Sequence, residues 1–325
     1  MIEINHLVKK YGTNFAVDDI SFSVKEGEVL GFLGPNGAGK TTTMNILTGY
    51  LSATSGSAKI AGIDILENPM EAKKHIGFLP EHPPLYLDMT VKEYLNFVYN
   101  LKKCTLNRKK HIAEICSVIK IEEVYKRPIS HLSKGYRQRV GIAQALIGNP
   151  DVLIFDEPTV GLDPKQIIEI RNLITGLGKK HTIILSSHIL PEVQSVCGRI
   201  VIINKGKIVA DAKTHELEVL TGARKHIAKI TGNSSEVQRM ISGIIGVTSC
   251  ECLGDPDGDA LSYLIETQSD VDVRKMLFRR VAESGQYMTG LEPVGANLED
   301  VFITLTNAPA AASDAKTSAS SGEAE

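Results

Sequence analysis

The chain has 325 residues, of which 42% are hydrophobic and 23% are charged, so it can form one large α/β domain or two unequal domains with a substantial core. Acidic residues number 38 and basic residues 36, and this balance gives no reason to expect a nucleic acid partner. The longest apolar runs hold about four residues, as at 200–203, against the roughly 20 that a membrane span needs, which excludes a transmembrane helix. Five scattered cysteines and an N-terminus unlike a signal peptide are typical of a cytosolic protein with reduced thiols.

Strands alternate with helices over roughly the first 200 residues. Residues 2–8 and 15–24 alternate apolar and polar side chains, as half-buried antiparallel strands do. Short continuous apolar runs, typical of strands buried on both faces, occupy 28–33, 76–79, 151–155, 182–186 and 199–204. Helices are predicted over 164–178 and 189–196, and a helical insertion over about 90–148, where apolar residues recur three and four apart. This alternation predicts an α/β fold with a parallel-sheet core.

The pattern changes from about Lys225 to the order βαββαβ, which predicts a small ferredoxin-like α+β domain. Its strands are predicted at 226–231, 247–252, 260–267 and 286–291, and its helices at 234–243 and 271–284. A short helix is predicted at 297–306. We therefore divide the chain into a domain over 1–222, an accessory domain over 223–306 and a tail over 307–325, whose Ala, Ser and charged composition is typical of disorder.

A glycine-rich loop follows the apolar run at 29–33. The residues Gly34-Pro35-Asn36-Gly37-Ala38-Gly39-Lys40-Thr41 match the pattern G-x-x-x-x-G-K-[ST] at every fixed position, and a helical stretch begins at Thr42. Glycines let successive backbone N–H groups converge on phosphate oxygens, and the helix N-terminus adds a partial positive charge. Lys40 is expected on the β- and γ-phosphates and the Thr41 hydroxyl on Mg²⁺. We call 34–41 the phosphate loop; with Thr42, it predicts binding of a nucleoside triphosphate.

Two acids end another predicted strand. Asp156 and Glu157 follow the apolar run at 152–155, and ligands of open α/β sheets bind at the carboxyl ends of the strands. Phosphoryl transfer needs a carboxylate for Mg²⁺ and a group that handles the attacking water. Asp156 is therefore expected to hold Mg²⁺ through water, and Glu157 to polarise the attacking water.

Four further motifs carry a family resemblance. Leu132-Ser133-Lys134-Gly135-Tyr136-Arg137-Gln138-Arg139 resembles the signature sequence of ABC-type ATPases. Gly161-Leu162-Asp163 is similar to that family's D-loop, and Ser187-His188 to its switch histidine. Tyr11 stands where the family places the aromatic residue that stacks on adenine. The resemblance covers roughly residues 1–220 and implies an ABC ATPase of the P-loop NTPase fold, with an antiparallel β subdomain and a helical subdomain.

The resemblance also implies roles for single residues. Ser133 and Gly135 are expected to hold the γ-phosphate of the nucleotide on the opposite subunit, and Asp163 to work across the subunit interface. His188 is expected to reach the γ-phosphate, as a catalytic residue beside Glu157 and Lys40. Phe15 is the alternative to Tyr11 for adenine stacking.

This chain departs from the family pattern at three positions. Lys134 stands where the signature usually has Gly, and Tyr136 where it has Gln. Glu81 occupies the place of a Gln that touches Mg²⁺ and the transport partner. A carboxylate can also coordinate Mg²⁺, so Glu81 is either a metal ligand or a solvated loop residue.

The resemblance implies an assembly as well. One copy of each motif predicts a homodimer, or a pair with a sister subunit, in which each ATP lies between Lys40 of one subunit and Ser133 and Gly135 of the other. Transport would then need a separate transmembrane permease, and would place this chain on the cytoplasmic face of the membrane. The motif at 79–83, the signature and the residues 297–302 look like those of ATP-binding subunits of ABC-2 type exporters. The nearest type is the gliding-motility-associated subunit, with sodium- and drug-efflux subunits close behind.

Two other classes of protein remain open. A soluble ABC ATPase that acts on ribosomes or DNA usually carries two ATPase halves, a long coiled coil or a basic arm. A metabolic kinase would leave Ser133, Gly135 and His188 unexplained. Stimulation of ATPase activity by membrane extract rather than by nucleic acid separates the transporter from the first class, and ADP release without a phosphorylated acceptor excludes the second.

Overall fold

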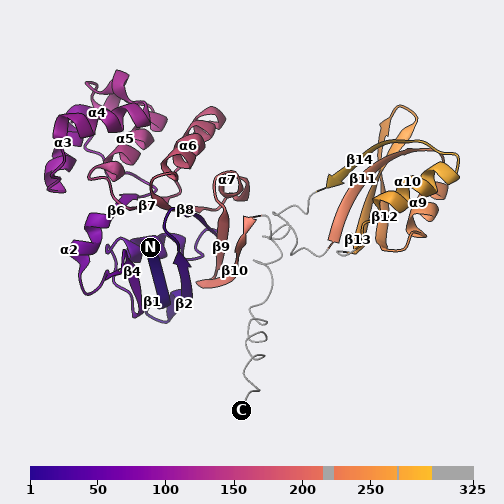
Figure 1. Cartoon of the computed structure of the whole chain (residues 1–325), viewed down its shortest axis with the longest axis horizontal. Coiled ribbons are helices and arrows are strands. Elements are labelled where there is room, and N and C mark those ends of the chain that lie inside the picture. The colour runs from indigo at the N-terminus through magenta and orange to yellow at the C-terminus, as the bar shows by residue number, and fades with distance from the viewer. Residues whose placement is uncertain (215–222, 269–270, 295–325) are drawn as a thin grey trace, which may run out of the picture. The chain divides into compact units, whose positions relative to one another are not determined.

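The computed structural model describes residues 1–214, 223–268 and 271–294. Two compact units make up the chain, Met1–Leu217 and Glu218–Glu325, which we call the N-terminal and C-terminal units (Figure 1). The boundary predicted at 222, the helix at 297–306, the tail at 307–325 and the motif at 297–302 all lie outside the described residues. Each unit is described by itself below.

A six-stranded sheet of order β10-β9-β3-β8-β7-β6 forms the centre of the N-terminal unit. Its strands are β3 (Val29–Leu33), β6 (Ile76–Leu79), β7 (Val152–Asp156), β8 (Thr182–Ser187), β9 (Arg199–Asn204) and β10 (Lys207–Lys213). All are parallel except β10, which pairs antiparallel with β9 at the edge. Every residue of β7 and β8 is buried, which explains their continuous apolar sequences. Because these strands are parallel, the loops that follow β3, β6, β7 and β8 meet at one edge of the sheet.

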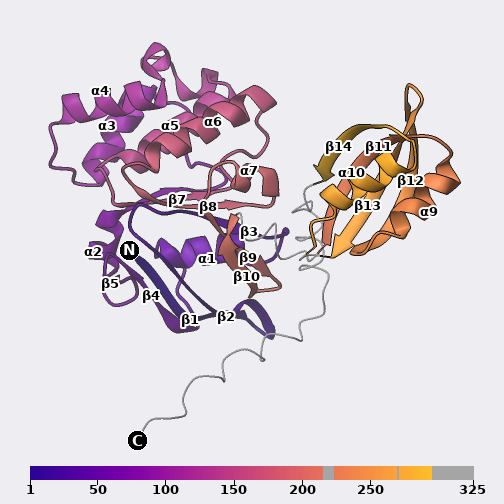
Figure 2. The ribbon, with the colours of Figure 1, turned by 45° about the vertical axis from the view of Figure 1, so that its right-hand side comes forward.

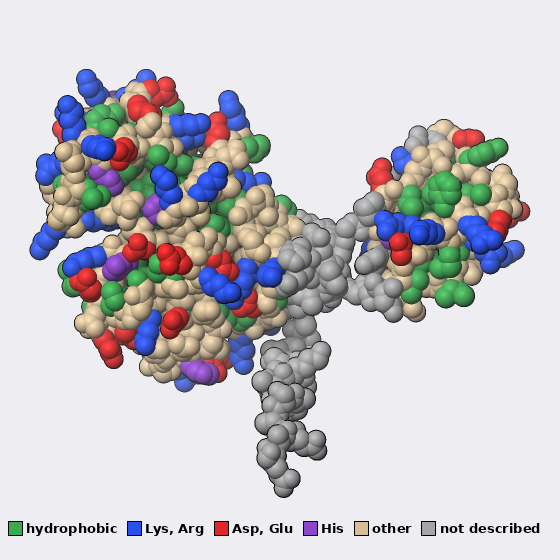
Figure 3. Space-filling model, viewed as in Figure 1, with side chains coloured by type: hydrophobic (Ala, Val, Ile, Leu, Met, Phe, Trp, Pro, Cys, Tyr) green, Lys and Arg blue, Asp and Glu red, His purple; other side chains and the backbone are tan. Residues whose placement is uncertain are grey.

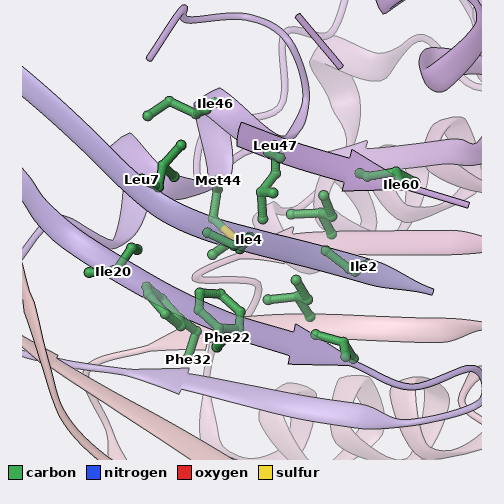
Figure 4. Packing of buried hydrophobic residues seen from close by; sticks show 14 of the residues in the cluster. Ile2, Ile4, Leu7, Ile20, Phe22, Phe32, Met44, Ile46, Leu47 and Ile60 are labelled. Atoms are coloured by element: carbon green, nitrogen blue, oxygen red, sulfur yellow. The ribbon is translucent and has the colours of Figure 1, made fainter. Parts of the chain in front are cut away.

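A second, antiparallel sheet has the order β2-β1-β4-β5. It contains β1 (Ile2–Tyr11), β2 (Asn14–Val24), β4 (Ser55–Ile60) and β5 (Ile63–Asp64). Helix α1 (Lys40–Leu47) lies between the two sheets (Figure 2). Figure 4 shows the shared core, in which Met44 of α1 reaches toward Ile4 of β1 and the rings of Phe22 and Phe32 stack with their centroids 5.4 Å apart. This packing fixes the helix that follows the phosphate loop.

Helices of the predicted insertion form a separate layer (Figure 2). They are α3 (Val91–Leu101), α4 (Arg108–Ile119) and α5 (Lys134–Leu146), with turns of 3-10 helix at Glu122–Val124 and Ile129–His131 between α4 and α5. The short α2 (Pro69–Ala72) and a 3-10 turn at Lys73–His75 precede β6. Thr90 and Glu93 cap the N-terminus of α3 reciprocally. Asp163 caps the N-terminus of helix α6 (Pro164–Leu177), and its side chain accepts a hydrogen bond from Gln166 N at 2.9 Å. The predicted helical insertion is therefore confirmed.

The C-terminal unit has the order β11 (Ala223–Thr231), α9 (Ser234–Ser242), β12 (Val247–Asp257), β13 (Ala260–Gln268), α10 (Arg274–Glu283) and β14 (Met288–Val294). Its sheet is antiparallel with strand order β12-β13-β11-β14. Val237 and Leu277 from the two helices pack with Ile230, Tyr263 and Ile265 of the sheet. This is the predicted ferredoxin-like arrangement.

Helix α7 (Leu190–Gln194) packs so closely on β3 that a glycine is required there. A Cβ built on Gly31 would lie 1.9 Å from Val193 Cγ1. Gly31→Ala is therefore expected to lower the free energy of unfolding by about 1–3 kcal/mol, the usual cost of overpacking. Gly176→Ala on α6 is the matched control, because a Cβ there meets nothing within 4 Å; it is expected to raise stability by up to about 1 kcal/mol. Urea unfolding of both variants measures the difference, and equal effects of the two would contradict this explanation.

Candidate active site

The phosphate loop joins β3 to α1 at the edge where the parallel strands end. Two of its glycines lie against backbone of neighbouring strands. A Cβ at Gly34 would come within 2.4 Å of Ile203 O, and one at Gly39, whose φ is +109°, within 2.3 Å of Ala16 O. No L side chain fits at either position, so the glycine pattern is needed for the fold of the loop as well as for room around a phosphate.

Lys40 lies folded across this loop. Its Nζ donates hydrogen bonds to Gly34 O at 2.8 Å and Pro35 O at 3.2 Å. The same Nζ is 3.3 Å from Glu157 Oε1, and only 6% and 7% of the two side chains are exposed. Removed from water, this ion pair interacts strongly, and each charge depends on the other.

Glu157 also contacts the predicted switch histidine. His188 Nδ1 lies 2.9 Å from Glu157 Oε2, so an imidazole with its proton on Nδ1 donates to the carboxylate. The Glu157 N–H donates to Ser186 O at 3.2 Å and to Ser186 Oγ at 3.1 Å. These bonds hold Glu157 at a φ of +49°, a left-handed conformation that costs a non-glycine residue about 1 kcal/mol or more. The structure thus brings Lys40, Glu157 and His188 into one chain of contacts.

Asp156 is buried next to these groups, with 1% of its surface exposed. Hydroxyl groups of Ser186 and Thr41 donate hydrogen bonds to its carboxylate. Burial raises the pKa of Asp156 above its ordinary value, and the negative charges of Glu157 and Glu81 raise it further, against the lowering effect of the two hydroxyls. Carboxylate and hydroxyl oxygens that converge where negative charge accumulates fit a hard divalent cation such as Mg²⁺.

The raised pKa predicts a stability cost for Asp156 when no cation is bound. When the pKa of a carboxyl group is higher in the folded than in the unfolded state, the free energy of unfolding falls as the pH rises through the interval between the two pKa values. At neutral pH the ionised form of Asp156 therefore destabilises the fold. Asp156→Asn is expected to raise Tm by about 2–4 °C at pH 7.5 in EDTA, equivalent to about 1 kcal/mol. Thermal melting of the nucleotide-free chain tests this, and a lower Tm for the variant would contradict it. The difference between the two chains should shrink toward pH 4.

The signature residues lie elsewhere in the N-terminal unit. Ser133 caps α5, where its Oγ accepts a hydrogen bond from Tyr136 N at 3.4 Å. Ser133 and Gly135 line a cleft of about 930 Å³ between α4, α5 and α6, and Lys40 is not part of the lining in the described structure. Asp163 is exposed at the start of α6. Within one chain, Ser133 and Gly135 therefore line a cleft that includes no residue of the phosphate loop.

Both aromatic candidates stand at the β1–β2 hairpin. Tyr11 is 52% exposed and Phe15 48%. The ammonium groups of Lys9 and Lys10 lie over the two rings, 5.2 Å from the centroid of Tyr11 and 4.9 Å from that of Phe15. Both rings are about half exposed, so the geometry leaves both candidates for stacking open.

Two of the three residues that depart from the family pattern meet in one small pocket of about 170 Å³, whereas Tyr136 lines the cleft that contains Ser133 and Gly135. Glu81 and Lys134 both line the pocket, with Arg137 and Gln138. The ammonium of Lys134 lies directly over Gly161, where a Cβ would approach Nζ to 2.1 Å. Lys134 therefore contacts the 161–163 loop of its own chain.

Sequence reasoning missed three polar residues around the site, Thr159, Ser186 and Glu192. Ser186 binds both acids that end β7, and the buried Glu192 accepts hydrogen bonds from Thr159 and Ser187. Hydroxyl residues at the end of a buried strand are a weak signal for such contacts. A single acid in a short amphipathic helix carries no signal, because only the fold shows that it points inward.

Comparison with known proteins places the N-terminal unit in a family. The family model for ABC transporters matches residues 17–160. The bacitracin transport ATP-binding protein BcrA of Bacillus licheniformis is 39% identical over 213 residues, which cover 65% of this chain and 69% of BcrA. The linearmycin resistance ATP-binding protein LnrL of Bacillus subtilis (strain 168) is 32% identical over 316 residues, which cover 94% of this chain and 98% of LnrL.

A solved structure extends the likeness to the fold. It is a dimeric ATP-binding cassette in a post-hydrolysis state bound to ADP and phosphate, with a TM-score of 0.60 and 26% identity over 66% of this chain and 99% of the cassette. The predicted P-loop NTPase fold and ATPase activity are thereby confirmed. The relatives are subunits of transporters, which excludes the alternative of an ATPase that acts on ribosomes or DNA. The chain belongs to the ABC transporter family, as an ATP-binding and ATP-hydrolysing subunit of a membrane transporter.

Proposed function

We propose that this chain drives an exporter of the ABC-2 type, with two copies that close on ATP and separate after hydrolysis. The observation that carries the proposal is the contact chain of Lys40, Glu157 and His188 at one edge of the sheet, with Ser133 and Gly135 in a cleft that none of these three residues lines. The names of the two relatives, which refer to bacitracin transport and linearmycin resistance, support export. The motif resemblance to gliding-motility-associated subunits is the basis for the narrower subtype.

In this proposal each residue at the sheet edge has one task. Lys40 leaves its backbone acceptors to bind the β- and γ-phosphates, with N–H groups of the phosphate loop. Glu157 then accepts a proton from the attacking water, and His188 holds its carboxylate in place. Thr41 and Asp156, with Glu81 as a further candidate, would hold Mg²⁺, which neutralises phosphate charge when bound.

Dimerisation completes the site in the proposal. Ser133 and Gly135 would contact the γ-phosphate bound to the partner subunit, and Asp163 would lie at the interface. A ligand that binds only the closed state shifts the equilibrium toward it, so ATP favours the closed dimer and its hydrolysis favours opening.

Adenine recognition separates the two aromatic candidates. Tyr11→Ala is expected to weaken ATP binding by about 1–3 kcal/mol, the usual loss when a base–aromatic stack is removed. Phe15→Ala is the matched control at the same hairpin and is expected to leave affinity within about twofold. Titration of a fluorescent ATP analogue measures both dissociation constants. The reverse order of effects would assign the stack to Phe15.

The surface beside Glu81 is the proposed contact with the permease. Tyr86 is 53% exposed, and its ring packs edge-on against Tyr94 and Phe97, with centroids 6.2 Å and 5.3 Å away. Leu87, next to it, is 45% exposed. Exposed apolar side chains supported from beneath by an aromatic cluster are suited to receive a helix of another protein. None of the described helices is long and apolar enough to cross a membrane.

Purification from membranes tests this contact. The full chain, tagged and expressed in its own cells, is expected to co-purify with an integral membrane protein after detergent extraction. Tyr86→Asp should abolish the association, while Tyr50→Asp, at an 82% exposed tyrosine outside this surface, should leave it intact. Recovery of the chain without a membrane protein, or equal effects of both variants, would contradict the proposal. Basic and acidic residues are nearly balanced at 36 and 38, and Figure 3 shows them interspersed on the visible face of the N-terminal unit, so recovery with nucleic acid is not expected.

A further inference from the structure

Glu192 is a buried acid to which the proposed mechanism gives no task. It lies on α7, and 4% of its surface is exposed. Thr159 Oγ1 donates a hydrogen bond to Glu192 Oε2 at 2.5 Å, and Ser187 Oγ donates to the same oxygen at 3.4 Å. The guanidinium of Arg171 on α6 lies 3.8 Å from Oε1. A carboxylate removed from water persists only with such partners.

The two hydroxyl groups lie next to the proposed catalytic pair, one in the loop after β7 and the other at the last residue of β8. Thr159 is two residues beyond Glu157, and Ser187 immediately precedes His188. Ser187 Oγ also accepts a hydrogen bond from Ile189 N at 3.0 Å, which fixes the backbone on the far side of His188. One carboxylate thus ties the loop after β7 to the end of β8.

Helix α7 gives this carboxylate a rigid support. Val193, the next residue, packs against Gly31 of β3, the strand that leads into the phosphate loop. Ser195 Oγ donates a hydrogen bond to Glu192 O at 2.9 Å, which holds the backbone of the same turn. The position of Glu192 is therefore set by the sheet that positions Lys40.

We infer that Glu192 is a positioning residue for ATP hydrolysis. It holds the loop after β7 and the end of β8 in the register that keeps His188 Nδ1 2.9 Å from Glu157 Oε2. Glu192 acts through Thr159 and Ser187, the two residues whose hydroxyl groups it binds. The inference rests on the proposed role of Glu157.

Steady-state ATPase kinetics of the full chain test the inference. Glu192→Gln removes the charge at nearly constant volume, and Thr159→Val removes the hydroxyl that binds it. Each is expected to lower kcat by about 10- to 100-fold, the effect of a small misplacement of catalytic groups, with KM for ATP within about twofold. Thr159→Ser restores the hydroxyl and is expected to keep kcat within about twofold. Glu28→Gln is the matched control, because Glu28 pairs with Arg199 at 3.2 Å, at the opposite end of β3.

The double variant Glu192→Gln with Thr159→Val shows whether the two residues act as one unit. We expect it to be no slower than the slower single variant, because both substitutions remove the same link. A kcat for Glu192→Gln within twofold of the parent would overturn the inference, as would a fall for Thr159→Ser as large as that for Thr159→Val. Glu157→Gln is measured in parallel. If Glu157→Gln keeps the parental kcat, the proposed catalytic site itself is wrong. If Glu157→Gln is inactive while Glu192→Gln keeps the parental kcat, only the inference about Glu192 is wrong.

Discussion

Glu157→Gln is expected to lower kcat for ATP hydrolysis by about 10²- to 10⁴-fold, the contribution of a general base. The amide keeps the size of the side chain but cannot accept a proton from water. ATP binding is expected to persist, because the phosphate loop and Lys40 are unchanged. Bound ATP then survives, and the chain should accumulate as an ATP-stabilised dimer.

Phosphate release and size-exclusion chromatography with Mg²⁺ and ATP measure the two effects. Glu28→Gln is the control for a carboxylate-to-amide change at a partly buried ion pair away from the site. Turnover at the parental rate, or loss of turnover with a chain that remains monomeric in ATP, would contradict the role proposed for Glu157.

Lys40→Ala is expected to weaken ATP binding by about 10- to 100-fold, because a charge-assisted hydrogen bond to phosphate contributes about 1.5–3 kcal/mol. A second effect follows from the nucleotide-free structure. Lys40 is the cation 3.3 Å from the buried carboxylate of Glu157, and removal of one partner from a buried pair costs about 3–5 kcal/mol. The variant should therefore unfold at a lower temperature even without nucleotide.

The double variant Lys40→Ala with Glu157→Gln separates these effects. It contains no unpaired carboxylate at 157, so it should regain most of the lost stability while ATP binding stays weak. Thermal melting and ATP titration of the three chains give the measurements. A single Lys40→Ala variant that melts like the parent would show that the pair adds nothing to the folded chain.

Strong periodic patterns predicted most elements of the N-terminal unit. The apolar runs that became β3, β7 and β8 are buried on both faces in the structure, which is why they read as continuous. The pattern missed β4, β5 and β10. Ser55–Ile60 has only two buried residues and reads as a polar turn, and β5 has only two residues. These strands exist because a neighbouring strand supplies hydrogen bonds, which no local pattern records.

Functional residues, like strands, could be predicted only where a local pattern in the sequence records them. The phosphate loop, Asp156 and Glu157 were recognised because their spacing along the chain carries the chemistry. Ser186 and Glu192 were not predicted, because their hydrogen-bond partners Asp156 and Thr159 lie about 30 residues away in sequence. The contact of Lys134 with Gly161 was likewise invisible, since it depends on how α5 meets the 161–163 loop.

The sequence by itself determined that this chain binds and hydrolyses a nucleoside triphosphate and belongs with transporter ATPases, because consecutive residues form the phosphate loop and the acids that end β7. Only the tertiary structure decided which charges meet. Parallel strands with burial on both faces bring the loops after β3, β7 and β8 to one edge, so Lys40, Glu157 and His188 touch although more than 100 residues separate the first from the others. Burial then makes those contacts strong, because a charge removed from water depends on the partner that the fold supplies.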